Sequence, residues 1–174
     1  MKGYEWLNKV SAPKHMVEAI KLLGTSEVVG KKHNKTILNW AKECGLEKIY
    51  TADEISWCGL FLAVTIKRAN REPLKGYNAL RAREWAKWGM QSEKAEFGDI
   101  LVFAREGGGH VGYYVAEDKD CYHVLGGNQS NTVNVTRILK SRLIAIRRPE
   151  YINKPSEVKS IIASAMGAIS SNEA

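Results

Sequence analysis

The chain has 174 residues, of which 44% are hydrophobic and 26% charged, a composition that is ordinary for one globular domain. Lys and Arg (26) outnumber Asp and Glu (19), and the resulting formal net charge of +7 favours an anionic partner, either nucleic acid or a bacterial envelope polymer. The basic residues are scattered and form no dense run with interleaved aromatic residues, so a nucleic-acid partner is not expected.

The sequence shows no segment that would direct the chain to a membrane or hold it there. The longest apolar candidate, residues 60–66, is far shorter than the ~18 residues needed to span a bilayer. The N-terminal segment contains no apolar run of the signal-peptide type. We therefore expect a protein made in the cytoplasm without a signal peptide, with no stable membrane insertion, which reaches other compartments only by release or delivery.

Four helices are expected in the N-terminal half, after a leader segment over residues 1–14. The first helix covers about residues 16–23 and stops at Gly24. Asn34 can cap the second helix, and Gly45 follows its end. The third covers about residues 55–69 and is apolar nearly all round near its start, so it should lie in the core. The fourth covers about residues 78–88.

The pattern changes after Phe97 from helical to strand-like. Five strands are expected, at residues 100–103, 110–115, 121–125, 132–138 and 143–147. Helices followed by an antiparallel sheet of five to six strands predict the α+β class. Residues 1–150 are expected to form one domain, and residues 151–174 a C-terminal tail that is flexible or weakly helical.

Cys58 is the strongest candidate for a reactive group. The three cysteines, Cys44, Cys58 and Cys121, form no even disulfide framework and leave room for a free thiol. Cys58 stands at the start of the apolar third helix, where partial positive charge and unpaired N–H groups favour a thiolate and a developing oxyanion. The alternative is a small apolar residue of the core, because free Cys is among the most buried residue types.

His110 and the segment after the next strand supply possible partners for a thiol. His110 follows three glycines, among them Gly109, that let the backbone approach a substrate or a facing helix closely. Imidazole titrates near neutral pH and can serve as the base. Asn128 is expected beside it, where an amide oxygen can orient the imidazole, and Gln129 is a substitute for that role. The alternative is an ordinary Gly-Asn turn.

Three further residues are weaker candidates for substrate binding. Asp53 and Glu54 are expected to cap the third helix, or else to bind a substrate amine at the edge of a cleft. Trp57 can line a substrate groove next to Cys58, although tryptophans on helix faces are mostly core residues. Cys121 and His123 are too few to predict a metal site, so no metal or cofactor is expected.

Three segments taken in order resemble the NlpC/P60 and CHAP superfamily of papain-like cell-wall hydrolases, and most closely a branch common in phages and prophages. The segments are residues 53–58, residues 98–103 leading to 108–114, and residues 125–131. The resemblance covers roughly residues 16–148. The chain departs from it at Ser56, where relatives often have Pro, at Gly59, where they usually have Ala or Ser, and near Gly126, where CHAP relatives often carry Glu.

The resemblance implies a papain-like fold in which Cys58 is the nucleophile, His110 the base and Asn128 the third catalytic residue. The implied activity is a cysteine endopeptidase on peptidoglycan, of the phage endolysin type, acting as a monomer on the bacterial cell wall. Alternatives on the same fold are an N-acetylmuramoyl-L-alanine amidase and a thioester transferase. A non-catalytic basic module that binds the cell wall is the alternative of a different class.

Overall fold

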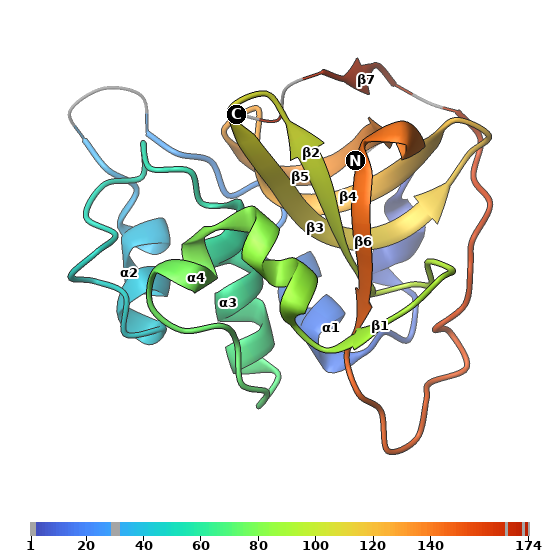
Figure 1. Ribbon diagram of the computed structural model, residues 1–174, viewed down its shortest axis with the longest axis horizontal. Helices are drawn as coiled ribbons and strands as arrows, with labels where there is room; N and C mark the ends of the chain where they lie inside the picture. The colour runs from blue at the N-terminus through green and yellow to red at the C-terminus, as the bar shows by residue number, and fades with distance from the viewer. Residues whose placement is uncertain (1–2, 29–31, 166, 172, 174) are drawn as a thin grey trace.

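The computed structural model describes residues 3–28, 32–165, 167–171 and 173. It has the expected α+β architecture, with N-terminal helices packed against a seven-stranded, mostly antiparallel open sheet (Figure 1). α3 lies between the sheet and the helices α2 and α4, whereas α1 packs directly on the sheet, with His15 against Tyr113 (Figure 1). This layering brings the start of α3 to the strands that carry the other candidate residues.

All but one of the described helices lie in the N-terminal half. Their bounds are η1 Glu5–Asn8, α1 Lys14–Lys21, α2 Lys35–Glu43, α3 Cys58–Arg68, α4 Tyr77–Leu80 and η2 Ala82–Lys87, with a later turn η3 Lys140–Arg142. The predicted cap of α2 is confirmed, since the Asn34 side chain accepts a hydrogen bond from the Thr36 N–H at 2.7 Å. The expected leader segment is not a loose end, because Leu7 of η1 is buried in the core.

The five predicted strands are all present, and most are longer than expected. They are β2 Ile100–Arg105, β3 Gly108–Glu117, β4 Cys121–Gln129, β5 Thr132–Leu139 and β6 Leu143–Arg148, with two-residue strands β1 Met90–Gln91 and β7 Ile169–Ser170 at the edges. The order across the sheet is β1-β6-β2-β3-β4-β5-β7, and every pair is antiparallel except β5 and β7. The expected sheet of five to six strands missed these two short edge strands.

The core has two parts because both faces of the sheet are covered. On β2, Ile100 and Val102 face the helices, while Leu101 and Phe103 belong to a smaller cluster on the other face. Such alternation is the period of a β-strand. Every residue of α3 from Cys58 to Ile66 is buried, as its all-round apolar sequence predicts.

The expected fourth helix is divided at Arg81, whose backbone is extended (φ −89°, ψ 110°). The Ala79 carbonyl accepts a hydrogen bond from the buried Trp85 indole N–H at 3.0 Å, so it does not serve a continuing helix. The same carbonyl lies against Gly59, where an added Cβ would come within 2.3 Å of its oxygen. Packing on α3 therefore breaks this helix into α4 and η2.

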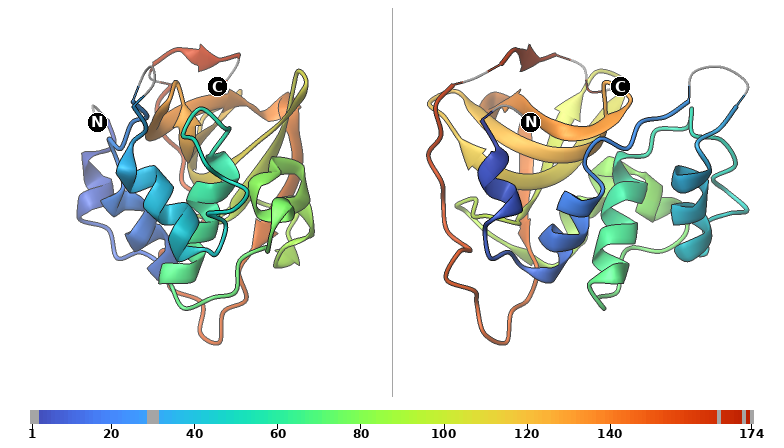
Figure 2. Two further views of the ribbon diagram at one scale, coloured as in Figure 1. Left: turned by 90° about the vertical axis from the view of Figure 1, so that its left-hand side faces the viewer. Right: turned by 180° about the vertical axis from the view of Figure 1, so that it is seen from behind.

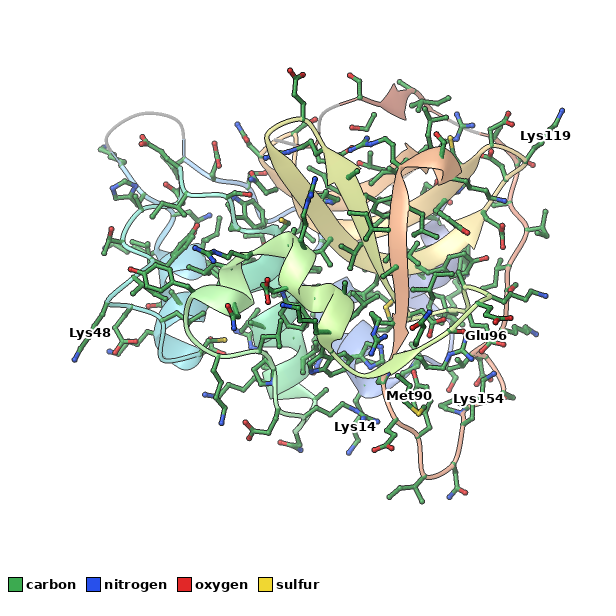
Figure 3. The ribbon with its side chains drawn as sticks, viewed as in Figure 1. Lys14, Lys48, Met90, Glu96, Lys119 and Lys154 are labelled. Carbon is green, nitrogen blue, oxygen red and sulfur yellow. The ribbon has the colours of Figure 1, made fainter. Side chains whose placement is uncertain are left out.

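The described part of the C-terminal tail contains no helix and runs extended along the sheet (Figure 2). The Glu117 N–H donates to the Ile161 carbonyl at 2.8 Å, and the Ala163 N–H donates to the Glu117 carbonyl at 2.9 Å. Lys154 forms an ion pair with Glu96 at the foot of the sheet (Figure 3). The expectation of a weak helix was wrong because the end of β3 and the edge of β5 satisfy the tail's backbone groups.

Candidate functional site

Cys58 is the first residue of α3. Its N-cap residue, Trp57, makes no side-chain hydrogen bond to the helix, so the N–H groups of the first turn are not taken up by a cap. The thiol is buried, with the Ser56 hydroxyl 3.8 Å from the sulfur. A sulfur in this position benefits from the positive end of the helix dipole.

His110 lies near the start of β3 and its imidazole hydrogen-bonds the Cys58 thiol. Its Nε2 is 3.0 Å from the Gln129 side-chain oxygen. Since Nε2 is occupied by Gln129, Nδ1 is the nitrogen left for the sulfur. The predicted proximity of a helix-borne thiol and a sheet-borne imidazole is therefore present in the structure.

The orientation of the Gln129 amide is determined by its other contacts. Its nitrogen donates to the Val124 carbonyl at 3.1 Å and to the Asn134 backbone and side-chain oxygens at 2.7 and 3.0 Å. The amide oxygen must then accept, so His110 carries its proton on Nε2 and presents the Nδ1 lone pair to the thiol. This is the tautomer that a general base needs.

Gln129, and not Asn128, holds the position that orients His110. Asn128 has a positive φ of 57°, and the β4–β5 pairing is irregular between Gly126 and Gln129. The Asn128 amide turns instead toward Ser56, with its nitrogen 3.4 Å from the Ser56 hydroxyl. Within the described residues, its buried oxygen has no hydrogen-bond partner. The structure therefore brings Gln129, the expected substitute, into contact with His110 in place of Asn128.

The surroundings of Cys58 favour the thiolate. Burial alone raises the pKa of the thiol, but the hydrogen bond and charge of His110, aided by Ser56 and the Val111 N–H, lower it below its ordinary value. Burial raises the pKa of Cys44 to about 11, and it also raises the pKa of Cys121. Cys58 is thus the cysteine whose pKa is lowered, whereas the pKa values of Cys44 and Cys121 are raised.

Two glycines of β4 allow the strand to approach the start of α3. A Cβ at Gly127 would lie 2.7 Å from the Trp57 ring and from the Phe61 Cβ. At Gly126 it would lie 2.7 Å from the Gln129 oxygen and 3.1 Å from His110 Nε2. These glycines look like turn formers in the sequence, and their close contact with α3 could be found only from the structure.

The other predicted substrate residues lie in different settings. Trp57 is fully buried and packs against Trp40 with ring centroids 6.0 Å apart, so it belongs to the core. Glu54 is exposed. Gly109 is partly exposed beside Arg83 at the β2–β3 end.

Asp53 is fully buried and does not cap α3, which begins five residues later. One carboxylate oxygen accepts from the Val28 and Asn34 N–H groups at 3.0 and 2.8 Å, and the other is 2.9 Å from His33 Nδ1. Burial raises the pKa of Asp53, but these hydrogen bonds lower it below its ordinary value. The prediction that Asp53 caps the third helix was wrong, because its carboxylate instead binds Val28, His33 and Asn34.

A second buried polar cluster lies at the opposite end of β4. His123 contacts the Tyr4 hydroxyl at 2.7 Å and Asp118 at 2.8 Å, and Arg137 donates to the same Asp118 oxygen at 2.7 Å. Arg137 also donates to the Gly167 carbonyl at 2.8 Å, so the cluster ties both chain ends to the sheet. Among the described residues, no group of three or more His, Cys, Asp or Glu could hold a metal ion.

The thiol, imidazole and amide of Cys58, His110 and Gln129 form one hydrogen-bonded row that can deliver a thiolate to an electrophilic carbon.

In the part of the chain that the structure describes, no helix has the length and apolar character needed to cross a bilayer. The comparisons with known proteins name no relative, because no protein-family model and no curated protein matches the chain.

Proposed function

We propose that this protein is a papain-like cysteine hydrolase that cleaves amide bonds of bacterial peptidoglycan. The row of Cys58, His110 and Gln129 carries the proposal, since each group is positioned for one role in acyl transfer. Support for the fold assignment comes from a cysteine heading a buried helix against an antiparallel sheet that bears the histidine and the amide. Residues 1–150 would form the hydrolase domain.

In the proposed mechanism Cys58 attacks the amide carbonyl while His110 Nδ1 takes its proton. First-turn N–H groups of α3 stabilise the tetrahedral oxyanion. His110 then protonates the leaving amine as the carbon–nitrogen bond breaks, which leaves a thioester on Cys58. Water, deprotonated by His110, hydrolyses the thioester and releases the carboxylic acid. The Gln129 side-chain oxygen accepts the hydrogen bond from Nε2–H throughout and stabilises the imidazolium.

The substrate class rests on the motif resemblance and on charge. A net charge of +7 would hold the protein near an anionic envelope polymer, an attraction that salt weakens. The labelled lysines Lys14, Lys48 and Lys119 point outward from separate edges of the molecule (Figure 3). Such spread charge suits loose attraction to a polymer, and we propose a monomer that reaches the wall by phage lysis or another delivery route.

The test is release of new amines from purified peptidoglycan. Cys58→Ala should abolish release while the far-ultraviolet circular dichroism stays unchanged, because the side chain removed is the nucleophile. Cys44→Ala is the matched control and should retain activity, since Cys44 lies at the end of α2, away from the row. Activity that survives Cys58→Ala would rule the mechanism out.

The same assay separates the roles of the two neighbouring amides. Gln129→Ala should lower kcat by about 100-fold, the scale of lost acid–base assistance, whereas Asn128→Ala should keep the base oriented and lower kcat far less. Mass spectrometry of the products distinguishes the alternatives. Cuts within the peptide indicate an endopeptidase, cuts at the sugar–peptide junction an amidase, and capped amines a transferase. An unchanged wall indicates a binding module.

A further inference from the structure

A buried ion pair lies beside the catalytic row and takes no part in the mechanism. Arg142 of η3 holds the Glu173 carboxylate with both ends of its guanidinium, at 2.7 and 2.8 Å. The Glu173 side chain is fully buried, and the Arg142 side chain is 16% exposed. Paired, bidentate contacts of this kind are the strongest that an arginine makes with a carboxylate.

Backbone contacts place this pair next to His110. The Arg142 Nε–H donates at 2.9 Å to the carbonyl of Ala104, which pairs across the sheet with Gly109, the residue before His110. The Glu173 carbonyl accepts from the Ser130 N–H at 3.0 Å, directly after Gln129. The pair therefore connects the end of β2, which pairs with the start of β3 beside His110, to the residue that follows Gln129.

The electrostatics agree with this placement. Burial raises the pKa of Glu173, but the hydrogen bond from Arg142 and the charge of His110 outweigh it and lower the pKa below its ordinary value. In every view β7 lies at the rim of the sheet, so the tail reaches this rim from outside (Figures 1 and 2). Glu173 is an anion that the chain's own end brings to the neighbourhood of the base.

The three residues of the candidate site are buried in the structure that has Glu173 in this position. Cys58 is 2% exposed, and His110 and Gln129 are each 1% exposed. Two cavities, of about 900 and 280 Å³, have none of these residues in their walls. We expect an amide substrate to displace a neighbouring contact to reach the buried sulfur. The contact of Glu173, which follows the two-residue strand β7, is cheaper to displace than one of the long strands of the sheet.

We propose that Arg142 is a carboxylate-binding subsite of the hydrolase, which Glu173 fills in the free protein and a carboxylate of the substrate fills during catalysis. The inference rests on the proposed function and narrows its substrate to peptides with a free carboxylate close to the scissile amide. Exchange of one carboxylate for another keeps the guanidinium paired, so no buried charge is left alone at any stage. The tail then acts as a built-in competitor of the substrate.

Binding of a small dicarboxylate tests the subsite without any need for catalysis. Glutarate and its neutral diamide, glutaramide, are titrated into the Cys58→Ala protein and followed by the NMR signals of arginine Nε–H groups. Glu173→Gln should tighten glutarate binding by at least about tenfold, the scale of a hydrogen bond to a charged group, and should leave glutaramide binding weak. The double variant Arg142→Gln with Glu173→Gln removes both charges and should lose the gain.

A matched control addresses nonspecific binding to any freed arginine. Glu43→Gln releases Arg68 from a similar two-pronged contact of 2.9 and 2.7 Å, but far from the row and at the surface, and should not tighten glutarate binding. Equal glutarate affinity in Glu173→Gln and the double variant would overturn the subsite, as would equal gains in Glu173→Gln and Glu43→Gln.

Turnover gives the second readout in proteins that retain Cys58. Glu173→Gln should raise kcat/KM on peptidoglycan, and adding Arg142→Gln should raise KM with little change in kcat. If the double variant had the same KM as Glu173→Gln, the subsite would be overturned. Failure of the proposed function gives a different result from failure of the subsite. In that case glutarate would still bind to Arg142, but the protein would not cleave peptidoglycan.

Discussion

At the scale of single residues, Gln129 decides which nitrogen of His110 acts as the base. Its amide nitrogen donates to Val124 and Asn134, so its oxygen is the atom that accepts the hydrogen bond from His110 Nε2–H. A neutral imidazole with Nδ1 facing the sulfur can accept the thiol proton and then stabilise the thiolate as an imidazolium. The contacts of the Gln129 side chain thus orient His110 so that it can accept the proton of the Cys58 thiol.

The lowered pKa of Cys58 leads to a prediction about its titration. The His110 contact outweighs burial and depresses this pKa, so the thiolate should persist below the ordinary pKa of cysteine. Ultraviolet absorbance of the thiolate, followed against pH, should show one transition below the ordinary pKa and, for Cys44, one at about 11. The pKa of Cys121 is raised, so this thiol should also titrate above the ordinary pKa.

Cysteine variants assign the two transitions. Cys58→Ala should remove only the low one and Cys44→Ala only the high one. The prediction fails if the low transition survives Cys58→Ala. Replacing His110 with Ala should move the low transition upward, because the group that offsets burial is then gone.

At the scale of elements, the site depends on how closely β4 lies against the start of α3. Gly127 touches Trp57 and Phe61 with no space for a side chain, and Gly126 leaves room for the His110–Gln129 contact. Trp57 is the buried residue just before α3, and its ring packs against Gly127. The helix and the strand together fix the sulfur relative to the imidazole.

Gly127→Ala should therefore damage both stability and activity. A Cβ placed 2.7 Å from a buried indole forces the strand and the helix apart, at a cost of about 1–3 kcal/mol in the free energy of unfolding. Urea denaturation measures the loss, and the wall assay should show a fall in kcat as Cys58 and His110 separate.

Gly108→Ala is the matched control for that substitution. It lies on β3 near the same end of the sheet, and an added Cβ there would meet nothing within 4 Å. Its stability and activity should stay close to those of the parent protein. Equal effects of the two substitutions would mean that the close approach at Gly127 does not matter.

At the scale of the whole molecule, both ends of the chain are held against the sheet. Tyr4 contacts His123, Arg137 reaches the Gly167 carbonyl, and Asp118 joins the two contacts. Through this cluster the first and last segments share one buried network. Its integrity also affects the rim, because the tail continues from Gly167 through β7 to Glu173.

Asp118→Asn should destabilise the protein in a pH-dependent way. The Arg137 hydrogen bond lowers the pKa of Asp118 despite burial, so its ionised form stabilises the fold above the unfolded-state value and this stability is lost as the pH falls. We expect a loss of about 3 kcal/mol at pH 7, the cost of breaking a buried pair, that shrinks below pH ~4. Urea denaturation at neutral and acid pH measures both.

Lys140→Met provides a control that breaks a more exposed pair on the same hairpin. Lys140 pairs with Glu117, and both side chains are less buried than those of the Asp118–Arg137 pair. Its effect should be small, since exposed pairs contribute little. A pH-independent loss in Asp118→Asn would contradict the charge argument.

The sequence by itself determined the α+β class, the capped second helix, the buried third helix, the five main strands and the proximity of the Cys58 thiol to the His110 imidazole. These follow from local periodicity, capping and the chemistry of a thiol at a helix start, which neighbouring residues largely decide. The tertiary structure decided what depends on distant partners. Those features are the break at Arg81, the choice of Gln129 over Asn128, and the docking of Glu173 on Arg142. The physical reason is that bulges, positive φ angles and edge pairing respond to long-range contacts, which local patterns do not encode.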